Sequence, residues 1–139
     1  MREILFKAKR KDNGEWVEGY YRADPDLDTH YICGWNYYVS ENGLERELFE
    51  EEIDPDTLCQ YTGLTDKNGQ KIWENDILCG RLDDIYPENI TYKKVVWDMN
   101  GFYTKEKYPT NFEILDKFDT EYFEVCGNIF DNADLLEVE

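Results

Sequence analysis

The chain of 139 residues has room for one domain, and its 32 Asp and Glu against 15 Lys and Arg give a formal net charge of −17. A field this negative repels phosphate backbones, so direct nucleic-acid binding through a basic surface is disfavoured. Hydrophobic residues make up 41% of the chain and aromatic residues 16%, a composition that excludes a disordered chain and predicts a folded, aromatic-rich domain.

The cysteine spacing and the hydropathy pattern predict no cofactor, metal site or membrane contact. The four cysteines, Cys33, Cys59, Cys79 and Cys126, lie far apart and form no C-x-x-C pair, so neither a zinc site nor a redox dithiol is expected. The first residues are basic and alternating, unlike a signal sequence, and no apolar run has the length of a membrane span. We therefore expect free thiols in a reducing cytoplasm.

The N-terminal segment predicts a β-hairpin. Ile4, Phe6 and Ala8 alternate with polar residues, as in a strand with one buried face. Asn13-Gly14 then marks a tight turn, and residues 16–22 predict the second strand.

Basic residues gather in and beside the first predicted strand, at Arg2, Lys7, Lys9, Arg10 and Lys11. They could form a strip that contacts phosphates. The favoured interpretation is the solvated face of an edge strand, where lysine discourages pairing with other chains.

Residues 23–29 predict a loop rich in Pro and Asp, and residues 30–39 predict one or two aromatic strands. His30 is the only histidine, and no nucleophile motif such as G-x-S-x-G accompanies it. A single histidine among aromatic strand residues indicates a structural role, so no catalytic residue is assigned.

The acidic block of residues 41–56 predicts a solvated loop or one face of a short helix. Leu44, Leu48 and Phe49 fall at helical spacings. The carboxylates do not follow the D-x-D-x-D-G spacing of calcium loops, so no metal site is assigned to them.

Residues 60–78 predict three short extended pieces joined by tight turns. Asn68-Gly69 is typical of a two-residue type I′ turn, Asn75 lies in a second turn, and Gly63 occupies a third position suited to positive φ. The favoured interpretation is a structural hairpin that fixes strand register, with Ile72 and Trp73 packing on opposite faces.

The alternative interpretation of the same hairpin is a recognition surface. Its candidate binding residues are Tyr61, Asp66, Asn68 and Trp73. Aromatic-lined grooves of small β-barrels suit peptide or protein ligands.

The C-terminal half predicts a second hairpin, with strands at residues 91–97 and 102–104, and then a turn of helix near residues 112–118. A last strand is expected at residues 122–125. Asn132 is expected to cap a short helix at residues 133–136, whose two leucines would close one end of a barrel.

Three segments resemble the YopX family of phage and prophage proteins: the start MREILFKAKR, the central run TLCQYTGLTDKNGQKIWENDIL and the end EVCGNIFDNADLLE. Residues 24–56 and 83–118 match no named pattern. Asn75 stands where the family more often has Gly, and Ala133 where it more often has Pro. The resemblance implies an SH3-like β-barrel core and an intracellular, phage-derived setting, and it implies no activity.

These observations predict a mainly β protein: a small, SH3-like, partly open β-barrel with additional N-terminal strands and short helices. One domain spans residues 1–139, with a β-rich part at 1–56 and the barrel core and C-terminal helix at 57–139. The predicted function is a non-enzymatic binding or interaction module with a protein partner, and homo-oligomers are compatible with its open edges and aromatic residues.

Two other function classes stay open. An acidic mimic of DNA could occupy a basic host protein. A hydrolase or nuclease dependent on a divalent cation could use neighbouring carboxylates such as Asp54 and Asp56, or Asp83 and Asp84.

Overall fold

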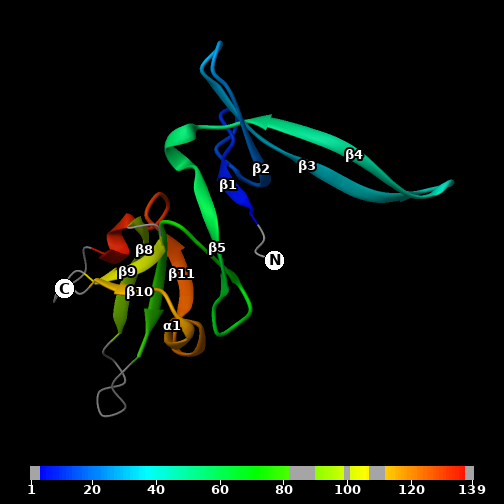
Figure 1. The fold of residues 1–139 in the computed structure, drawn as a ribbon. Helices are drawn as coiled ribbons and strands as arrows, with labels where there is room; N and C mark the ends of the chain where they lie inside the picture. The colour runs from blue at the N-terminus through cyan, green and yellow to red at the C-terminus, as the bar shows by residue number, and fades with distance from the viewer. Residues whose placement is uncertain (1–3, 82–89, 99–100, 107–111, 137–139) are drawn as a thin grey trace. The chain divides into compact units, whose positions relative to one another are not determined.

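The computed structural model describes residues 4–81, 90–98, 101–106 and 112–136. The chain divides into two compact units, Met1–Gln60 and Tyr61–Glu139, and the described part of both is built mainly from antiparallel strands (Figure 1). The mainly β prediction is confirmed. The strands in the described ranges form open sheets and not a closed barrel.

The first unit contains a sheet with the strand order β4-β3-β2-β1, continued on the other side of β1 by the first residues of β5. Its elements are β1 (Phe6–Lys9), β2 (Trp16–Asp24), β3 (Thr29–Ser40), β4 (Gly43–Glu52), the 3₁₀ helix η1 (Pro55–Thr57) and the start of β5 (Cys59–Thr65). The predicted N-terminal hairpin is confirmed, because β1 and β2 pair from Phe6–Gly19 to Lys9–Trp16.

Strand β1 is internal, so the prediction that its lysines mark a sheet edge is wrong. Phe6 pairs with Gly19 of β2 on one side and with Gln60 of β5 on the other. The ammonium groups of Lys7 and Lys9 lie 4.6 and 5.5 Å from the centroid of the Trp16 ring, where the negative face of the indole attracts them. Arg2 lies outside the described residues.

The core of the first unit lies under one face of this sheet. Ala8, Ile32 and Ile53 are almost completely buried, and they are surrounded by the half-buried side chains of Phe6, Val17, Tyr21, Phe49 and Leu58.

Strands β3 and β4 extend beyond the rest of their sheet as a two-stranded ribbon (Figure 1). Strand β3 pairs with β2 only from Thr29 to Cys33, whereas it pairs with β4 from Tyr31 to Ser40. We call residues 34–49 the arm. The prediction of a helix or loop in the acidic block is therefore wrong, because ten residues of this block pair in register with an aromatic strand.

The second unit contains a five-stranded antiparallel sheet with the order β10-β9-β8-β7-β11. Its elements after β5 are β6 (Lys71–Trp73), β7 (Asp76–Gly80), β8 (Thr91–Asp98), β9 (Gly101–Glu106), β10 (Phe112–Ile114), α1 (Lys117–Tyr122), β11 (Glu124–Asn128) and the 3₁₀ helix η2 (Ala133–Leu136). The predicted hairpin of β8 and β9 is confirmed. Its turn residues 99 and 100 lie outside the described residues.

The helix predicted near residues 112–118 begins later, because residues 112–114 form β10. Helix α1 begins after Asp116, whose carboxylate accepts a hydrogen bond from the N–H of Phe118, while the carboxylate of Asp119 accepts one from the N–H of Asp116. This reciprocal capping box, and not the apolar spacing upstream, sets the start of the helix.

The core of the second unit is formed by Ile72, Leu78, Val95, Phe102, Leu115 and Phe123. Leu135 and Leu136 in η2 are only half-buried, so they do not fill the end of a barrel as predicted. The side chain of Asn132 accepts a hydrogen bond from the N–H of Asn128 at 3.2 Å and so fixes the turn before η2.

Candidate functional site

The four candidate binding residues of the central hairpin all lie in the β5–β6 region. Asp66 is buried, and its carboxylate accepts three backbone hydrogen bonds: from the N–H groups of Asn68 at 2.8 Å, Gln70 at 2.9 Å and Val125 at 2.8 Å. These bonds close the hairpin turn and tie it to the start of β11. The side chain of Asp66 thus has a structural task in the fold.

The other three residues also have contacts within the second unit. Tyr61 and Trp73 are opposite one another in the β5–β6 pair, both are buried, and their ring centroids are 5.5 Å apart. The amide of the exposed Asn68 donates to the carboxylate of Glu124 at 2.8 Å. These contacts favour the structural interpretation of the hairpin, and the binding role of the four residues stays a prediction.

The hairpin turn differs from the predicted type I′ geometry. Gly69 has a φ of +81°, but Asn68 is not among the described residues with positive φ. The N–H of Gly69 donates to the carbonyl of Asp66 at 3.0 Å, and the N–H of Asp66 donates to the carbonyl of Gln70 at 2.8 Å. The loop therefore spans three residues with a left-handed glycine at the end, a common alternative to the two-residue turn. The other two predicted special positions, Gly63 and Asn75, do have positive φ.

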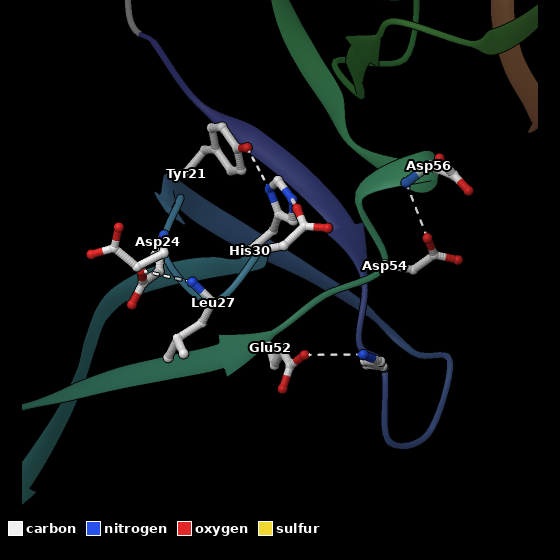
Figure 2. A network of polar contacts seen from close by, with 10 residues as sticks. Tyr21, Asp24, Leu27, His30, Glu52, Asp54 and Asp56 are labelled. Atoms are coloured by element: carbon white, nitrogen blue, oxygen red, sulfur yellow. Dashed lines mark hydrogen bonds and ion pairs between the residues drawn. The ribbon is translucent and has the colours of Figure 1, made fainter.

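His30 packs within the first unit, as Figure 2 shows. Its Nδ1 lies 2.7 Å from the hydroxyl of Tyr21, the two rings are stacked, and its Nε2 lies 3.4 Å from Oδ1 of Asp28. The candidate metal-binding carboxylate of Asp54 accepts the N–H of Asp56 at 3.0 Å and caps η1. Asp83 and Asp84 lie outside the described residues.

The second unit contains a buried ion pair. Nζ of Lys93 lies 3.1 Å from Oδ1 of Asp119, and both side chains are almost completely buried. The same ammonium group lies 4.4 Å from the centroid of the Phe123 ring. The second oxygen of Asp119 belongs to the capping box of α1. The ion pair thus anchors α1 to β8, while the second oxygen of Asp119 caps the start of the helix.

All four cysteines are free thiols. Cys79 and Cys126 come from the neighbouring strands β7 and β11. Burial, and then the adjacent thiol of Cys79, raises the pKa of Cys126 to about 12. A thiol with so high a pKa is a poor nucleophile at neutral pH, so Cys126 is unsuited to covalent chemistry.

The arm presents the most prominent exposed apolar surface of the first unit. Residues directly opposite one another in an antiparallel pair project to the same face, and successive residues alternate. The β3–β4 register therefore places five large apolar side chains on one face, with exposed fractions of 43% for Trp35, 64% for Tyr37, 83% for Val39, 73% for Leu44 and 58% for Leu48. We call these five residues with Arg46 the apolar face of the arm.

Arg46 is the one ionised residue on this face, and its guanidinium carbon lies 4.2 Å from the centroid of the Trp35 ring. Of the three carboxylates of the arm, Glu45 and Glu47 lie on the reverse face with Asn36 and Tyr38, and Glu41 lies in the turn at its tip. In a chain with a net charge of −17, this face is free of acidic side chains.

The apolar face is not the continuation of the core. Ile32, the buried core residue of β3, and Phe49, which packs against the core, share the reverse face of the β3–β4 ladder. At the root of the arm, a Cβ on Gly34 would lie 2.7 Å from the Phe49 ring, so only glycine leaves room for this packing. The five exposed apolar residues therefore project from the opposite side of the sheet and have no role in the core of their own unit.

The sequence contains the signal for this face, although the leucines of the acidic block also suit a helix. Asn42-Gly43 is a hairpin dipeptide, and Gly43 has a φ of +101°. Trp35, Tyr37 and Val39 fall at every second position before it, and Leu44 and Leu48 lie four positions apart after it. The helical spacing of the two leucines equals two periods of a strand, and so it did not distinguish the two structures.

Among the described residues, no group of three or more His, Cys, Asp or Glu side chains converges as a metal site. None of the helices in the same part of the chain combines the length and the hydropathy needed to cross a membrane.

Comparisons with known proteins agree with the fold and extend along nearly the whole chain. The family model described as YopX protein matches residues 5–137. A search of curated proteins gives no match. Among solved structures, the chain is similar in fold to protein EF1440 from Enterococcus faecalis, with a TM-score of 0.61 and 23% sequence identity over 98% of this chain and 99% of that chain. The match to the family model covers both units, and the chain belongs to the YopX family.

Proposed function

We propose that this protein is a non-catalytic interaction module that binds protein through the apolar face of its β3–β4 arm. The observation that carries the proposal is the position of Trp35, Tyr37, Val39, Leu44 and Leu48 on one exposed face that is free of carboxylates. Exposed apolar surface of this kind, bordered by polar residues, is typical of protein–protein interfaces.

The size of this face supports the proposal. The five side chains expose on the order of 600 Å² together, since a large side chain carries roughly 150–250 Å² of surface. This value is at the upper limit of the largest apolar patch on a typical monomer, about 300–600 Å². The composition also fits, because Trp, Tyr and Arg are the residues most often found at the energetic centre of interfaces.

The shape of the arm supports it as well. A hairpin of two strands without further packing is only marginally stable in water, and beyond Cys33 the arm pairs with no third strand among the described residues. A partner that covers the apolar face would supply the missing packing layer.

Membership of the YopX family supports a setting in a phage or prophage, with action in the cytoplasm of the bacterial host. The SH3-like topology expected for the second unit stays part of this proposal. So does an accessory role in which the protein acts by binding and not by turnover.

The two alternative functions have less support. The carboxylates at the base of the arm are paired within the chain: Glu50 with Arg22, Glu51 with Arg10 and Glu52 with Lys11. A DNA mimic would present such groups unpaired, as a row of anionic charges. For a hydrolase, the carboxylate of Asp54 is engaged in capping η1.

The proposal can be tested by photocrosslinking in bacterial cells that express the tagged protein. One variant carries Val39→p-benzoylphenylalanine on the apolar face, and the matched control carries Glu47→p-benzoylphenylalanine on the reverse face of the same arm. We expect protein adducts, identified by mass spectrometry, from position 39 and few from position 47. Equal or absent adducts at the two positions would contradict the proposed function.

A further inference from the structure

The register of the arm also indicates which partner covers it. We infer that the apolar face of the arm packs against the same face of a second copy of this chain, so that two arms form a small two-layer β-sandwich. This inference rests on the proposed function and names the occupant of that surface. Two sheets pack face to face at about 10 Å, a distance that the large side chains of these arms can fill.

The distribution of charge favours a second copy. A partner with the same net charge of −17 can approach only at a place where neither copy presents unpaired carboxylates. The apolar face meets this condition, because Glu45 and Glu47 lie on the reverse face. The nearest carboxylates on its own side, Glu50 and Glu52, already have ion-pair partners in Arg22 and Lys11 of the same copy.

The same distribution disfavours two other partners. Pairing of two β4 edges would place rows of glutamates side by side on the reverse face, where like charges destabilise a sheet. A basic protein would find its complementary charge on that reverse face and not among the apolar residues. The single cation, Arg46, is stacked on Trp35 of its own arm, so two copies do not bring together bare charges.

The area is adequate for a twofold dimer. An isologous contact buries the same patch on both copies, so two faces of on the order of 600 Å² would bury about 1,200 Å², the low end of specific interfaces. Since the strip continues to the tip residues Val39 and Leu44, its whole length is available to a second arm. We expect a dissociation constant on the order of 1–10 μM.

Salt provides the sharpest discrimination between partners. Two chains of like charge repel one another less as the Debye length falls from about 30 Å at 0.01 M salt to about 8 Å at 0.15 M. The dimer should therefore strengthen as NaCl is raised. A complex with a basic partner would instead weaken over the same range.

The test is sedimentation equilibrium of the purified full chain over a range of concentrations and NaCl. The Tyr37→Ser/Leu44→Ser variant removes two exposed apolar groups, and Tyr38→Ser is the matched control on the reverse face. We expect the dissociation constant of the dimer to rise at least about 100-fold in the double variant and to change less than about threefold in the control. Circular dichroism verifies that both variants keep the folded spectrum.

A monomer at all concentrations, or a dimer that the double variant leaves intact, would overturn the inference. The crosslinking experiment separates this failure from failure of the proposed function. If position 39 crosslinks to a different protein and the purified chain is monomeric, the proposed function as an interaction module stands and the inference of self-association is rejected. Adducts at position 39 between two copies support both.

Discussion

At the scale of single residues, Asp66 shows how an apparent recognition residue becomes a structural one. Its position beside Asn68-Gly69 and between aromatic residues is compatible with a ligand loop. In the fold, its carboxylate accepts three backbone N–H groups, two from its own turn and one from Val125. Removal of the acceptor of a part-buried donor of this kind costs about 1 kcal/mol.

We expect Asp66→Ala to lower the free energy of unfolding by about 2–4 kcal/mol, because three N–H donors lose their acceptor. Asn68→Ala is the control in the same turn, since it removes one exposed contact with Glu124 and should cost less than about 1 kcal/mol. Urea denaturation measures both values. Equal effects of the two substitutions would contradict the structural role of the carboxylate.

The thiol of Cys126 makes a second prediction at this scale. Its pKa in the folded protein is raised to about 12 by burial and by the adjacent Cys79, whereas the pKa of an unfolded cysteine is about 8.5. The folded state therefore holds its proton more tightly. The resulting stabilisation is complete below about pH 8.5 and is lost progressively as the pH rises toward about 12.

Accordingly, the difference in free energy of unfolding between the wild type and Cys126→Ala should shrink as the pH is raised from about 7.5 to about 10. Guanidinium denaturation at several pH values gives this difference directly, and contributions from titrating groups distant from Cys126 cancel in it. If the difference in free energy of unfolding stays constant over this pH range, the thiol of Cys126 has the same pKa in the folded and unfolded states, which contradicts the prediction.

At the scale of elements, α1 is too short to be stable by itself, since isolated helices need roughly 12–15 residues. Two interactions hold its six residues. The capping box of Asp116 and Asp119 satisfies its first N–H groups, and the buried pair of Lys93 and Asp119 fastens it to β8. Asp119 takes part in both, so it links the helix start to the sheet.

Removal of one member of this pair should therefore be costly. We expect Lys93→Met to lower the free energy of unfolding by about 3 kcal/mol, because it leaves a buried carboxylate without its cation. The double variant Lys93→Met/Asp119→Asn should recover part of the loss, since Asn carries no charge and still accepts the N–H of Asp116. Lys94→Met on the same strand should change stability by less than about 0.5 kcal/mol.

These values are measured by chemical denaturation of the three variants in parallel. A double variant less stable than Lys93→Met would show that the negative charge of Asp119 stabilises the fold without its lysine.

The arm is also an element whose properties follow from register. Each of its strands has a polar and an apolar side, and the Glu41-Asn42 turn aligns the two apolar sides on one face. A shift of one residue in the pairing would mix carboxylates into that face. The contrast between an apolar face and an acidic reverse face is therefore a consequence of the turn after Ser40.

At the scale of the whole molecule, the net charge of −17 is distributed in a way that bears on association. Acidic residues occupy the reverse face of the arm, while those at its base are paired with Arg10, Lys11 and Arg22. Repulsion between like charges thus disfavours contact between most surfaces of two copies, and the apolar face of the arm is the surface on which this repulsion is smallest. The expected strengthening of the dimer by salt follows from this distribution.

Much of the fold could be predicted from the sequence where the pattern is local. Alternation of apolar and polar residues predicts the hairpin of β1 and β2 and the strands β8 and β9. Turn and capping residues predict the special positions Gly63 and Asn75 and the short helix that begins at Ala133. The YopX family is also evident from three short segments. These features depend on residues only a few positions apart, and so they can be read from neighbours in the chain.

The tertiary structure alone decided which strands are internal and which faces stay exposed. The lysines of β1 are typical of an edge strand, yet β1 pairs on both sides. The leucines of the acidic block suit a helix as well as a strand, yet they lie in β4, which pairs with β3. Leu44 and Leu48 are spaced alike on a helix turn and on two strand periods, so only hydrogen bonding to a distant strand distinguishes the two. Exposure of the apolar face likewise depends on where the core lies, and that is fixed by contacts between residues far apart in sequence.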